Sequence, residues 1–203
     1  ADFMETYSFD GIDIDWEYPG GGGLGSNTSR PEDTENFTLL LQAVRNELDT
    51  RGAASNRHYL LTIAAPAGAS KVANIEVEQI HPLLDFINVM TYDFNGDWSA
   101  VSNFNAPLYP SPEDPTITPG VNADATVQRY LGRGVPSDKL VLGVPFYGRA
   151  VQGVPNVNGG LFQSYTGTPL GTWDDATSGA TGMFDYADIV LNYLGQPGID
   201  AYR

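Results

Sequence analysis

Three acidic side chains occupy alternate positions in the segment FDGIDIDWEYPG, which spans residues 9 to 20. They are Asp13, Asp15 and Glu17, and they alternate with two isoleucines and a tryptophan. In a β-strand, side chains two residues apart share a face and lie about 6.6 to 7 Å apart. In a partly buried site, three neighbouring carboxylates cannot all ionise at low cost, so at least one is expected to hold a proton at neutral pH. The segment therefore predicts acid–base chemistry, with Glu17, the last of the three in the strand, as the acid.

An acidic cluster can also be a solvated surface or a cation site. A solvated face is uncommon in a strand of a parallel sheet, because both faces of such a sheet are covered. A calcium loop of the EF-hand type needs glycine at its sixth and glutamate at its twelfth position, and counting from Asp13 these positions hold Tyr18 and Leu24. A metal site made from Asp13 and Asp15 stays open, but no histidine lies nearby in the sequence. We therefore expect no metal and no cofactor.

Two later segments place polar and aromatic side chains after apolar runs. They are MTYDFNGDW, residues 90 to 98, and GVPFYGRA, residues 143 to 150. Each side chain has a structural explanation of its own, such as core packing for a methionine or an ion pair for an arginine. Together they describe a pocket for a neutral sugar, because aromatic rings stack on pyranose faces and carboxylates bind hydroxyl groups. The candidates are Met90, Tyr92, Asp93, Trp98, Tyr147 and Arg149.

Strands and helices alternate along most of the chain. Periodicity and turn signals predict strands at 8–17, 59–67, 86–94 and 139–150, and helices after Pro31, at 70–85, at 122–133 and at 184–195. Strands that alternate with helices indicate a parallel sheet, either doubly wound or part of a barrel. Ligands bind at the carboxyl ends of the strands in both folds.

The first of these helices is predicted in most detail. Pro31 suits its first turn, and Gly52 is expected to end it. Its apolar stripe consists of Leu39, Leu40, Ala43, Val44 and Leu48. Before the acidic strand, Phe3, Met4 and Tyr7 have the spacing of a helix's buried face.

The composition excludes several classes of partner. The 203 residues include 10 Lys plus Arg and 25 Asp plus Glu, which gives a formal net charge of −15. Such a field repels phosphate backbones and anionic lipids, so neither nucleic acid nor a membrane is expected as a partner. The chain has no cysteine, which excludes thiol catalysis and disulfides. Sequons at Asn27 and Asn36 lean towards secretion.

The acidic strand resembles the signature of a known family. FDGIDIDWEYPG is similar to the pattern D-G-x-D-x-D-x-E, which marks the fourth strand of the (β/α)8 barrel in the family 18 glycoside hydrolases, the chitinases and their relatives. MTYDFNGDW resembles the family's sixth-strand motif and GVPFYGRA its seventh. The resemblance covers the chain from about Tyr7 onward. It implies an α/β fold of the TIM-barrel class, here with about strands 4 to 7.

The resemblance also implies a mechanism. Glu17 would protonate the leaving glycosidic oxygen and later activate water, while Asp15 would turn between Asp13 and the N-acetyl group of the substrate. The acetamide oxygen of the substrate would attack the anomeric carbon, which gives an oxazolinium intermediate and net retention. The carboxylate spacing alone fits the inverting range, so retention is implied by the family pattern. Met90 would line the floor of the site.

The other candidates would bind the sugar. By the resemblance, Tyr92 hydrogen-bonds the acetamide, and Asp93 lies in the same subsite. Tyr147 and Arg149 would contact the sugar on the leaving-group side, where Trp98 would be a stacking platform.

The resemblance implies that residues 1–150 form part of a catalytic barrel and that 151–203 begin a small α+β insertion domain. A complete barrel takes about 250 residues. Strands one to three and eight have no counterpart, so we expect an internal part of a longer enzyme.

The expected substrates are chitin and chitooligosaccharides, β-1,4-linked polymers of N-acetylglucosamine. The resemblance implies a secreted, extracellular and monomeric glycoside hydrolase of the endochitinase type. A chitin-binding lectin on the same scaffold is an alternative, although an intact Glu17 means that a lectin would need another lesion. An endo-β-N-acetylglucosaminidase acting on N-glycans, which shares the acidic strand, is the other.

Overall fold

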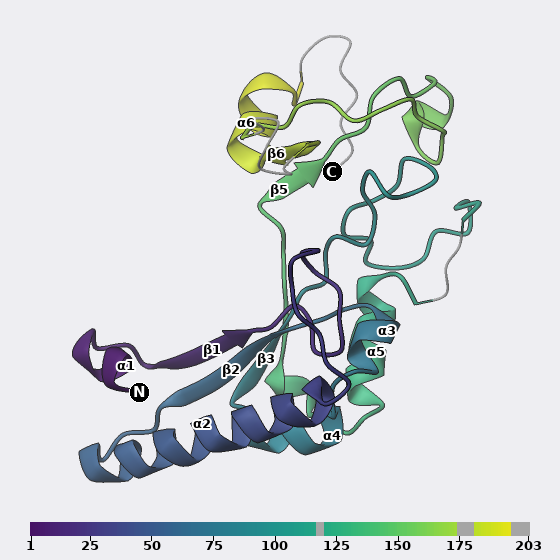
Figure 1. Ribbon diagram of the computed structural model, residues 1–203. Coiled ribbons are helices and arrows are strands. Elements are labelled where there is room, and N and C mark those ends of the chain that lie inside the picture. The colour runs from purple at the N-terminus through teal and green to yellow at the C-terminus, as the bar shows by residue number, and fades with distance from the viewer. Residues whose placement is uncertain (117–119, 174–180, 196–203) are drawn as a thin grey trace. The chain divides into compact units, whose positions relative to one another are not determined.

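The computed structural model describes residues 1–116, 120–173 and 181–195 (Figure 1). The chain forms two compact units, each built from two segments. The first unit consists of Ala1–Thr91 and Ala123–Gly143, and the second of Tyr92–Asn122 and Val144–Arg203. The domain division predicted from the sequence, at residue 150, is a different one and stays a prediction.

A four-stranded parallel sheet forms the framework of the first unit. Its strands follow the order β1 (Gly11–Asp15), β2 (Leu60–Ala65), β3 (Phe86–Val89) and β4 (Leu140–Leu142). All three pairings are parallel. This confirms the predicted parallel α/β arrangement.

Helical segments precede and connect these strands. They are α1 (Asp2–Thr6), α2 (Asp33–Ser55), α3 (Ala69–Val72), α4 (Val77–Ile80), the 3-10 helix η1 (His81–Leu83), α5 (Ala123–Leu131) and the 3-10 helix η2 (Ser137–Lys139). Among the described residues, no helix has both the length and the apolar character that a membrane span needs.

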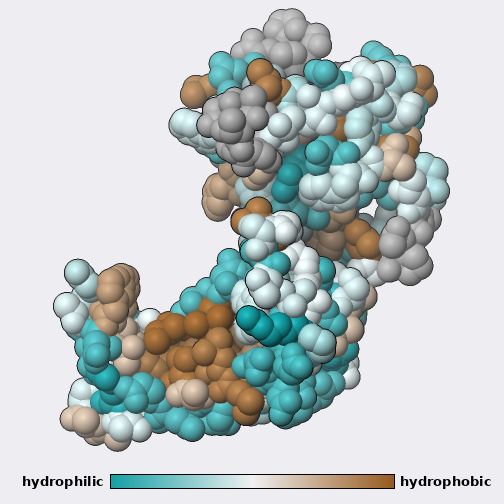
Figure 2. Space-filling view, viewed as in Figure 1, coloured by the Kyte–Doolittle hydropathy of each residue, from teal (hydrophilic) through white to brown (hydrophobic). Residues whose placement is uncertain are grey.

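Helix α2 turns a different face to the core from the one predicted. Its buried positions are Asp33, Phe37, Leu41, Arg45, Leu48 and Gly52. Leu39 and Leu40 are exposed, and Figure 2 shows apolar surface over β1 and α2. The predicted stripe was therefore right for Val44 and Leu48 and wrong for Leu39, Leu40 and Ala43. In the observed phase of the helix, Phe37 packs edge to face against Trp16.

Two further expectations in this unit were wrong. Gly52 lies inside α2, which continues to Ser55 and is capped by Asn56 in a left-handed conformation. A Cβ at Gly52 would lie 2.4 Å from the carbonyl oxygen of Arg57, so the residue allows close backbone approach rather than ending the helix. Met4 of α1 is buried, whereas Phe3 of α1 and Tyr7, which caps the helix, are exposed and contact each other with ring centroids 4.6 Å apart.

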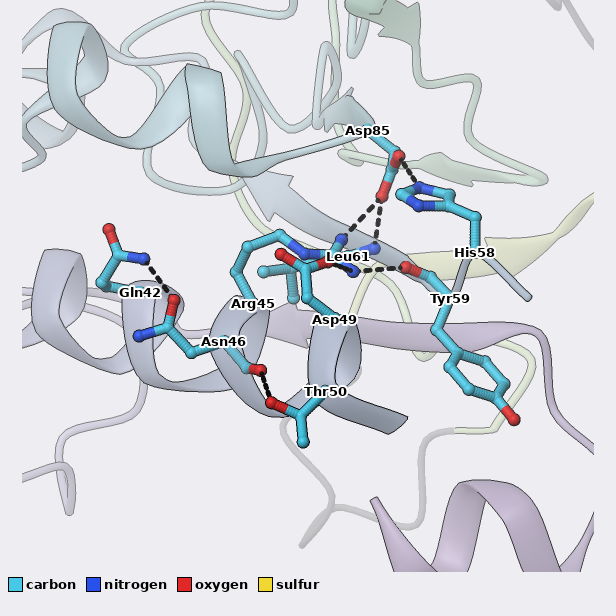
Figure 3. Close-up of polar contacts among 9 residues, drawn as sticks. All are labelled: Gln42, Arg45, Asn46, Asp49, Thr50, His58, Tyr59, Leu61 and Asp85. Atoms are coloured by element: carbon cyan, nitrogen blue, oxygen red, sulfur yellow. Dashed lines mark hydrogen bonds and ion pairs between the residues drawn. The ribbon is translucent and has the colours of Figure 1, made fainter. Parts of the chain in front are cut away.

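A buried arginine connects α2 to the starts of two strands (Figure 3). The guanidinium of Arg45 donates to the carbonyl oxygen of Tyr59 at 2.9 Å and to Asp85 at 3.3 Å. Asp85 also accepts from the amide of Leu61 at 2.7 Å and pairs with His58 at 2.5 Å. Burial alone would raise the pKa of Asp85, but the Leu61 amide, His58 and Arg45 outweigh it and lower that pKa.

The second unit contains a two-stranded antiparallel sheet of β5 (Tyr147–Arg149) and β6 (Met183–Asp185). It also contains η3 (Asn158–Gly160) and α6 (Tyr186–Asn192). The single strand predicted at 139–150 is thus two strands in different sheets. The chain leaves the parallel ladder after β4, and Pro145, which has no N–H to donate, lies in the break.

Candidate active site

The carboxylates of the acidic segment lie on one face of β1 and just beyond its end. The strand ends at Asp15, so Glu17 lies two residues into the following loop and not in the strand as predicted. Asp13, Asp15 and Glu17 are exposed, whereas Ile12, Ile14 and Trp16 are partly buried and pack against the core of the first unit. The predicted separation of a carboxylate face from an apolar face is confirmed.

Neighbouring strands hold Asp13. Asp13 lies opposite Thr62 of β2, and Ala64 lies opposite Asn88 of β3, so the three polar residues share a face of the sheet. The Thr62 hydroxyl donates a hydrogen bond to Oδ1 of Asp13. The side-chain amide of Asn88 donates to the same oxygen at 3.2 Å. Asp13 is thereby fixed by rigid strands rather than by a loop.

Asp15 lies between two other acids. Although Asp15 is exposed, partial desolvation of its carboxyl group raises its pKa, the charges of Glu17 and Asp13 raise it further, and a side-chain hydrogen bond with Glu17 acts in the same direction. Each of these effects favours the protonated form. The direction agrees with the prediction that the cluster retains a proton, and it places the raised pKa on Asp15.

The loop after Glu17 forms one wall of an open pocket beside the carboxylates. The pocket has a volume of about 610 Å³, and its lining includes Asp15, Glu17, Leu24 and Asn27. The amide of Asn27 donates to the carbonyl oxygen of Glu17 at 2.9 Å. A Cβ at Gly23 would lie 2.2 Å from that same oxygen, so only glycine allows this approach.

Five candidates lie in the second unit, and contacts join all of them into one group, which we call the Asp93–Arg149 cluster. Nε of Arg149 donates to Oδ1 of Asp93 at 2.6 Å. The guanidinium carbon of Arg149 lies 4.7 Å from the ring centroid of Trp98 and 5.8 Å from that of Tyr147. The rings of Tyr147 and Tyr92 meet edge to face with centroids 6.2 Å apart, which brings in the fifth.

This Asp93–Arg149 cluster shifts the titration of its members. Burial raises the pKa of Tyr147, and a hydrogen bond to Asp93 adds to the effect. The hydrogen bond with Asp93 also raises the pKa of Arg149. A neutral phenol beside a charged pair provides donors for sugar hydroxyl and carbonyl oxygens.

Trp98 is an exposed ring supported from one side. Its side chain is 57% exposed. A Cβ at Gly96 would lie 2.6 Å from the ring atoms Cη2 and Cζ3, and 2.9 Å from Cδ of Arg149. Gly96 and Arg149 therefore fix the indole and leave ring surface for a stacking partner.

Met90 follows β3 in the first unit. It is partly buried, and its amide donates to the carbonyl oxygen of Ala65 at 2.9 Å. By strand alternation it shares a face with Asn88, and hence with Asp13. Each unit thus brings together its own candidates: the three carboxylates with Met90, and the aromatic residues with Asp93 and Arg149.

Several supporting residues were missed in the sequence. They are Thr62, Asn88, Asn27, Gly96 and Asn105, which accepts a hydrogen bond from the amide of Asp93. A polar residue within an apolar run was the available signal for Thr62 and Asn88. In the part of the chain that the structure describes, no three His, Asp or Glu side chains are grouped in a way that could hold a metal ion.

Comparison with known proteins decides the family. The model of the family described as Glycosyl hydrolases family 18 matches residues 1–198. The chain belongs to glycosyl hydrolases family 18. Among its family 18 relatives, Chitinase A1 of Niallia circulans is 46% identical over 209 residues, an alignment that covers 100% of this chain and 29% of the relative.

Solved structures of a chitinase and of a family 18 enzyme agree with the fold. Chitinase ChiA74 from Bacillus thuringiensis matches with a TM-score of 0.90 and 46% identity, over 97% of this chain and 32% of that one. A family 18 N-acetylglucosaminidase from Paenibacillus barengoltzii matches with a TM-score of 0.83 and 34% identity, over 97% of this chain and 54% of that one. The parallel sheet of the first unit therefore belongs to the barrel fold of the family, and the chain spans about a third to a half of these proteins.

Proposed function

We propose that the protein is a chitinase that hydrolyses β-1,4 linkages between N-acetylglucosamine units in chitin and chitooligosaccharides. The observation that carries the proposal is the acidic strand: three carboxylates on one face, with a raised pKa on Asp15 because of burial and of the neighbouring Glu17 and Asp13. Family membership and the names of relatives such as Chitinase A1 support the same activity.

The proposed mechanism is retaining and uses the substrate's own acetamide. Glu17 donates a proton to the glycosidic oxygen as the bond from that oxygen to the anomeric carbon breaks. The acetamide oxygen attacks the anomeric carbon and forms an oxazolinium ion. Glu17 then takes a proton from water, and the water oxygen attacks the same carbon and opens the ring, so the product keeps the β configuration.

Asp15 and Asp13 have supporting roles in this proposal. A protonated Asp15 can donate a hydrogen bond, which is what orients an acetamide and stabilises the charge that develops on it. Asp13 stays in place through its bonds from Thr62 and Asn88, and it can share the proton of Asp15 when Asp15 turns back from the substrate towards it. The pair thus holds one proton near the reacting sugar.

The Asp93–Arg149 cluster is proposed to bind the same substrate. Tyr92 and Asp93 hold the acetamide, and Tyr147 and Arg149 contact the sugar on the leaving-group side. Trp98 stacks on a pyranose face there. Met90 lines the floor beside the carboxylates, and residues 151–203 begin the insertion domain of the enzyme.

Two alternatives to a chitinase remain: one binds the same sugars without cleaving them, and the other cleaves a different substrate. A lectin would bind chitooligosaccharides without turnover, and an endo-β-N-acetylglucosaminidase would cleave N-glycan cores. A third candidate, an N-acetylglucosaminidase, is favoured by one observation, the 34% identity to such an enzyme from Paenibacillus barengoltzii. We propose that the protein acts outside the cell, because polymeric chitin has to be reached there and the sequons agree with secretion. We also propose that it acts as a monomer.

The test is hydrolysis of chromogenic glycosides of N-acetylglucosamine, chitobiose and chitotriose, together with proton NMR of the first product anomer. The proposal predicts turnover of the chitobioside and chitotrioside, with β product formed first. Release from the monosaccharide alone would favour the N-acetylglucosaminidase, and cleavage of an N-glycan core alone the endo-β-N-acetylglucosaminidase. An α product would overturn the mechanism, and tight binding without any turnover would favour the lectin.

A further inference from the structure

Asn105 holds two successive backbone amides of the segment that carries Asp93. Its side-chain Oδ1 accepts a hydrogen bond from the N–H of Asp93 at 3.0 Å. Its own carbonyl oxygen accepts from the N–H of Phe94, also at 3.0 Å. Both bonds lie within the second unit. One residue therefore fixes the backbone at the position from which the Asp93 side chain projects.

Asp93 has a backbone conformation that needs such support. Its φ is 56°, in the left-handed region, which residues other than glycine adopt only rarely. Conformations of this kind persist where surrounding groups over-determine them. In this turn the carboxylate of Asp93 reaches Nε of Arg149 at 2.6 Å and hydrogen-bonds Tyr147.

The amide nitrogen of Asn105, unlike its oxygen, makes no hydrogen bond in the described part of the chain that would support the turn. Its Nδ2 is buried and has no hydrogen-bond partner among the described residues. A buried unpaired donor lowers the stability that an asparagine can add. What the side chain supplies is the neutral acceptor for the Asp93 amide, and a neutral acceptor avoids a second negative charge next to Asp93.

We infer that Asn105 is a positioning residue for sugar binding. By fixing the left-handed turn at Asp93, it aims the Asp93 carboxylate at Arg149 and Tyr147, and through Arg149 it sets the plane of Trp98. The inference rests on the proposed function, because it assumes that this cluster contacts the substrate. It adds a residue outside the three sequence motifs to the site.

The chain offers a matched control in the same segment. Asn103 donates from its amide to Asp114 at 2.6 Å and accepts from the amide of Phe104 at 2.8 Å. It supports the same segment, and among the hydrogen bonds of the described residues none joins it to Asp93. Asn105→Ala and Asn103→Ala therefore remove equivalent side chains, and only the first removes the bond to Asp93.

The experiment compares both variants for chitotetraose affinity, for kcat/KM, and for the NMR signal of the Arg149 Nε–H. We expect Asn105→Ala to lower affinity and kcat/KM by about tenfold and to move the Arg149 signal, with less than a twofold change in Asn103→Ala. In an Arg149→Ala background the Asn105 effect on affinity should shrink, because the part transmitted through Arg149 is gone, which a merely structural role would not produce. Equal losses in the two variants, or an undiminished loss in that background, would overturn the inference.

The NMR signal separates this inference from the proposed function. If the wild type cleaves no chitooligosaccharide but Asn105→Ala alone moves the Arg149 signal, the function fails and the structural link from Asn105 to Arg149 stands. If the wild type is active and the Arg149 signal is unmoved in Asn105→Ala, the positioning role fails and the function stands.

Discussion

Asp13 and Thr62 face each other across β1 and β2, and the Thr62 hydroxyl donates a hydrogen bond to Oδ1 of Asp13. Asn88 of β3 donates to the same oxygen. Asp13 is therefore tied to the sheet by two side chains, while Asp15 ends the strand and Glu17 lies in the following loop.

Removing the Thr62 hydroxyl should slow the reaction without unfolding the protein. Thr62 is 5% exposed, and valine fills the same space. We expect Thr62→Val to lower kcat by about tenfold, because one bond to a charged partner is lost, and to change KM little. Steady-state kinetics checks this. The matched control is Thr126→Val, a buried threonine of α5 that donates to the carbonyl oxygen of Ala67; an equal loss there would contradict a specific role for Thr62.

The raised pKa of Asp15 depends on its neighbour. After burial, the charge of Glu17 is the next largest cause, and the hydrogen bond to Glu17 adds to it. Glu17→Gln should therefore lower the Asp15 pKa towards its ordinary value, since a neutral amide no longer repels the ionised form. Carbon-13 NMR titration of the Asp15 carboxyl measures the change. An unmoved pKa would contradict a contribution from Glu17 and leave burial and the charge of Asp13 as the causes.

Gly96 should be required for the orientation of Trp98. A Cβ at this position would lie 2.6 Å from the indole, so Gly96→Ala has to displace the ring or Arg149. We expect the affinity for chitooligosaccharides to fall by about three- to tenfold, the range of an aromatic contact. Calorimetric titration tests this, with Gly68→Ala as control because nothing lies within 4 Å of a Cβ there. Equal affinities in Gly96→Ala and the wild type would exclude Trp98 as a platform.

Asp85 should make folding stability depend on acid pH. Its folded-state pKa is lowered, so its contribution is fully present above the unfolded value of about 3.9 and is lost as the pH falls through the folded-state pKa. Asp85→Asn should lower the free energy of unfolding by about 1.5 to 3 kcal/mol at pH 7. At pH 3 the free energies of unfolding of the variant and the wild type should lie closer together. Urea unfolding at both pH values measures it. Asp49→Asn, which alters a mostly exposed partner of Arg45, is the control. A constant difference between the two pH values would contradict the assignment.

The parallel sheet and the two faces of β1 could be predicted from the sequence, because the alternation of strands with helices, and of Asp13 and Asp15 with apolar residues, are local patterns. The phase of α2 was not accessible in this way, since leucines at 39 and 40 and apolar residues at 37 and 41 fit a helix equally well. In the structure Phe37 and Leu41 are the buried residues, and Phe37 packs against Trp16.

Long-range contacts explain the other differences. The apolar run from 139 to 150 is continuous in composition, and only the pairing of β5 with β6 shows that it divides. Asn105 is twelve positions from Asp93, and no periodicity connects the two. Such residues become visible only when hydrogen bonds can be followed through space.

The role of Glu17 is the central claim, and Glu17→Gln tests it most directly. The variant keeps the size and hydrogen-bonding ability of the side chain but cannot donate the catalytic proton. Hydrolysis of a chromogenic chitobioside should fall by at least about 100-fold, while binding of chitotetraose stays within about threefold of wild type. Glu35→Gln, at an exposed site in α2, should keep full activity. Turnover of Glu17→Gln at the wild-type rate would contradict the assignment of Glu17 as the acid.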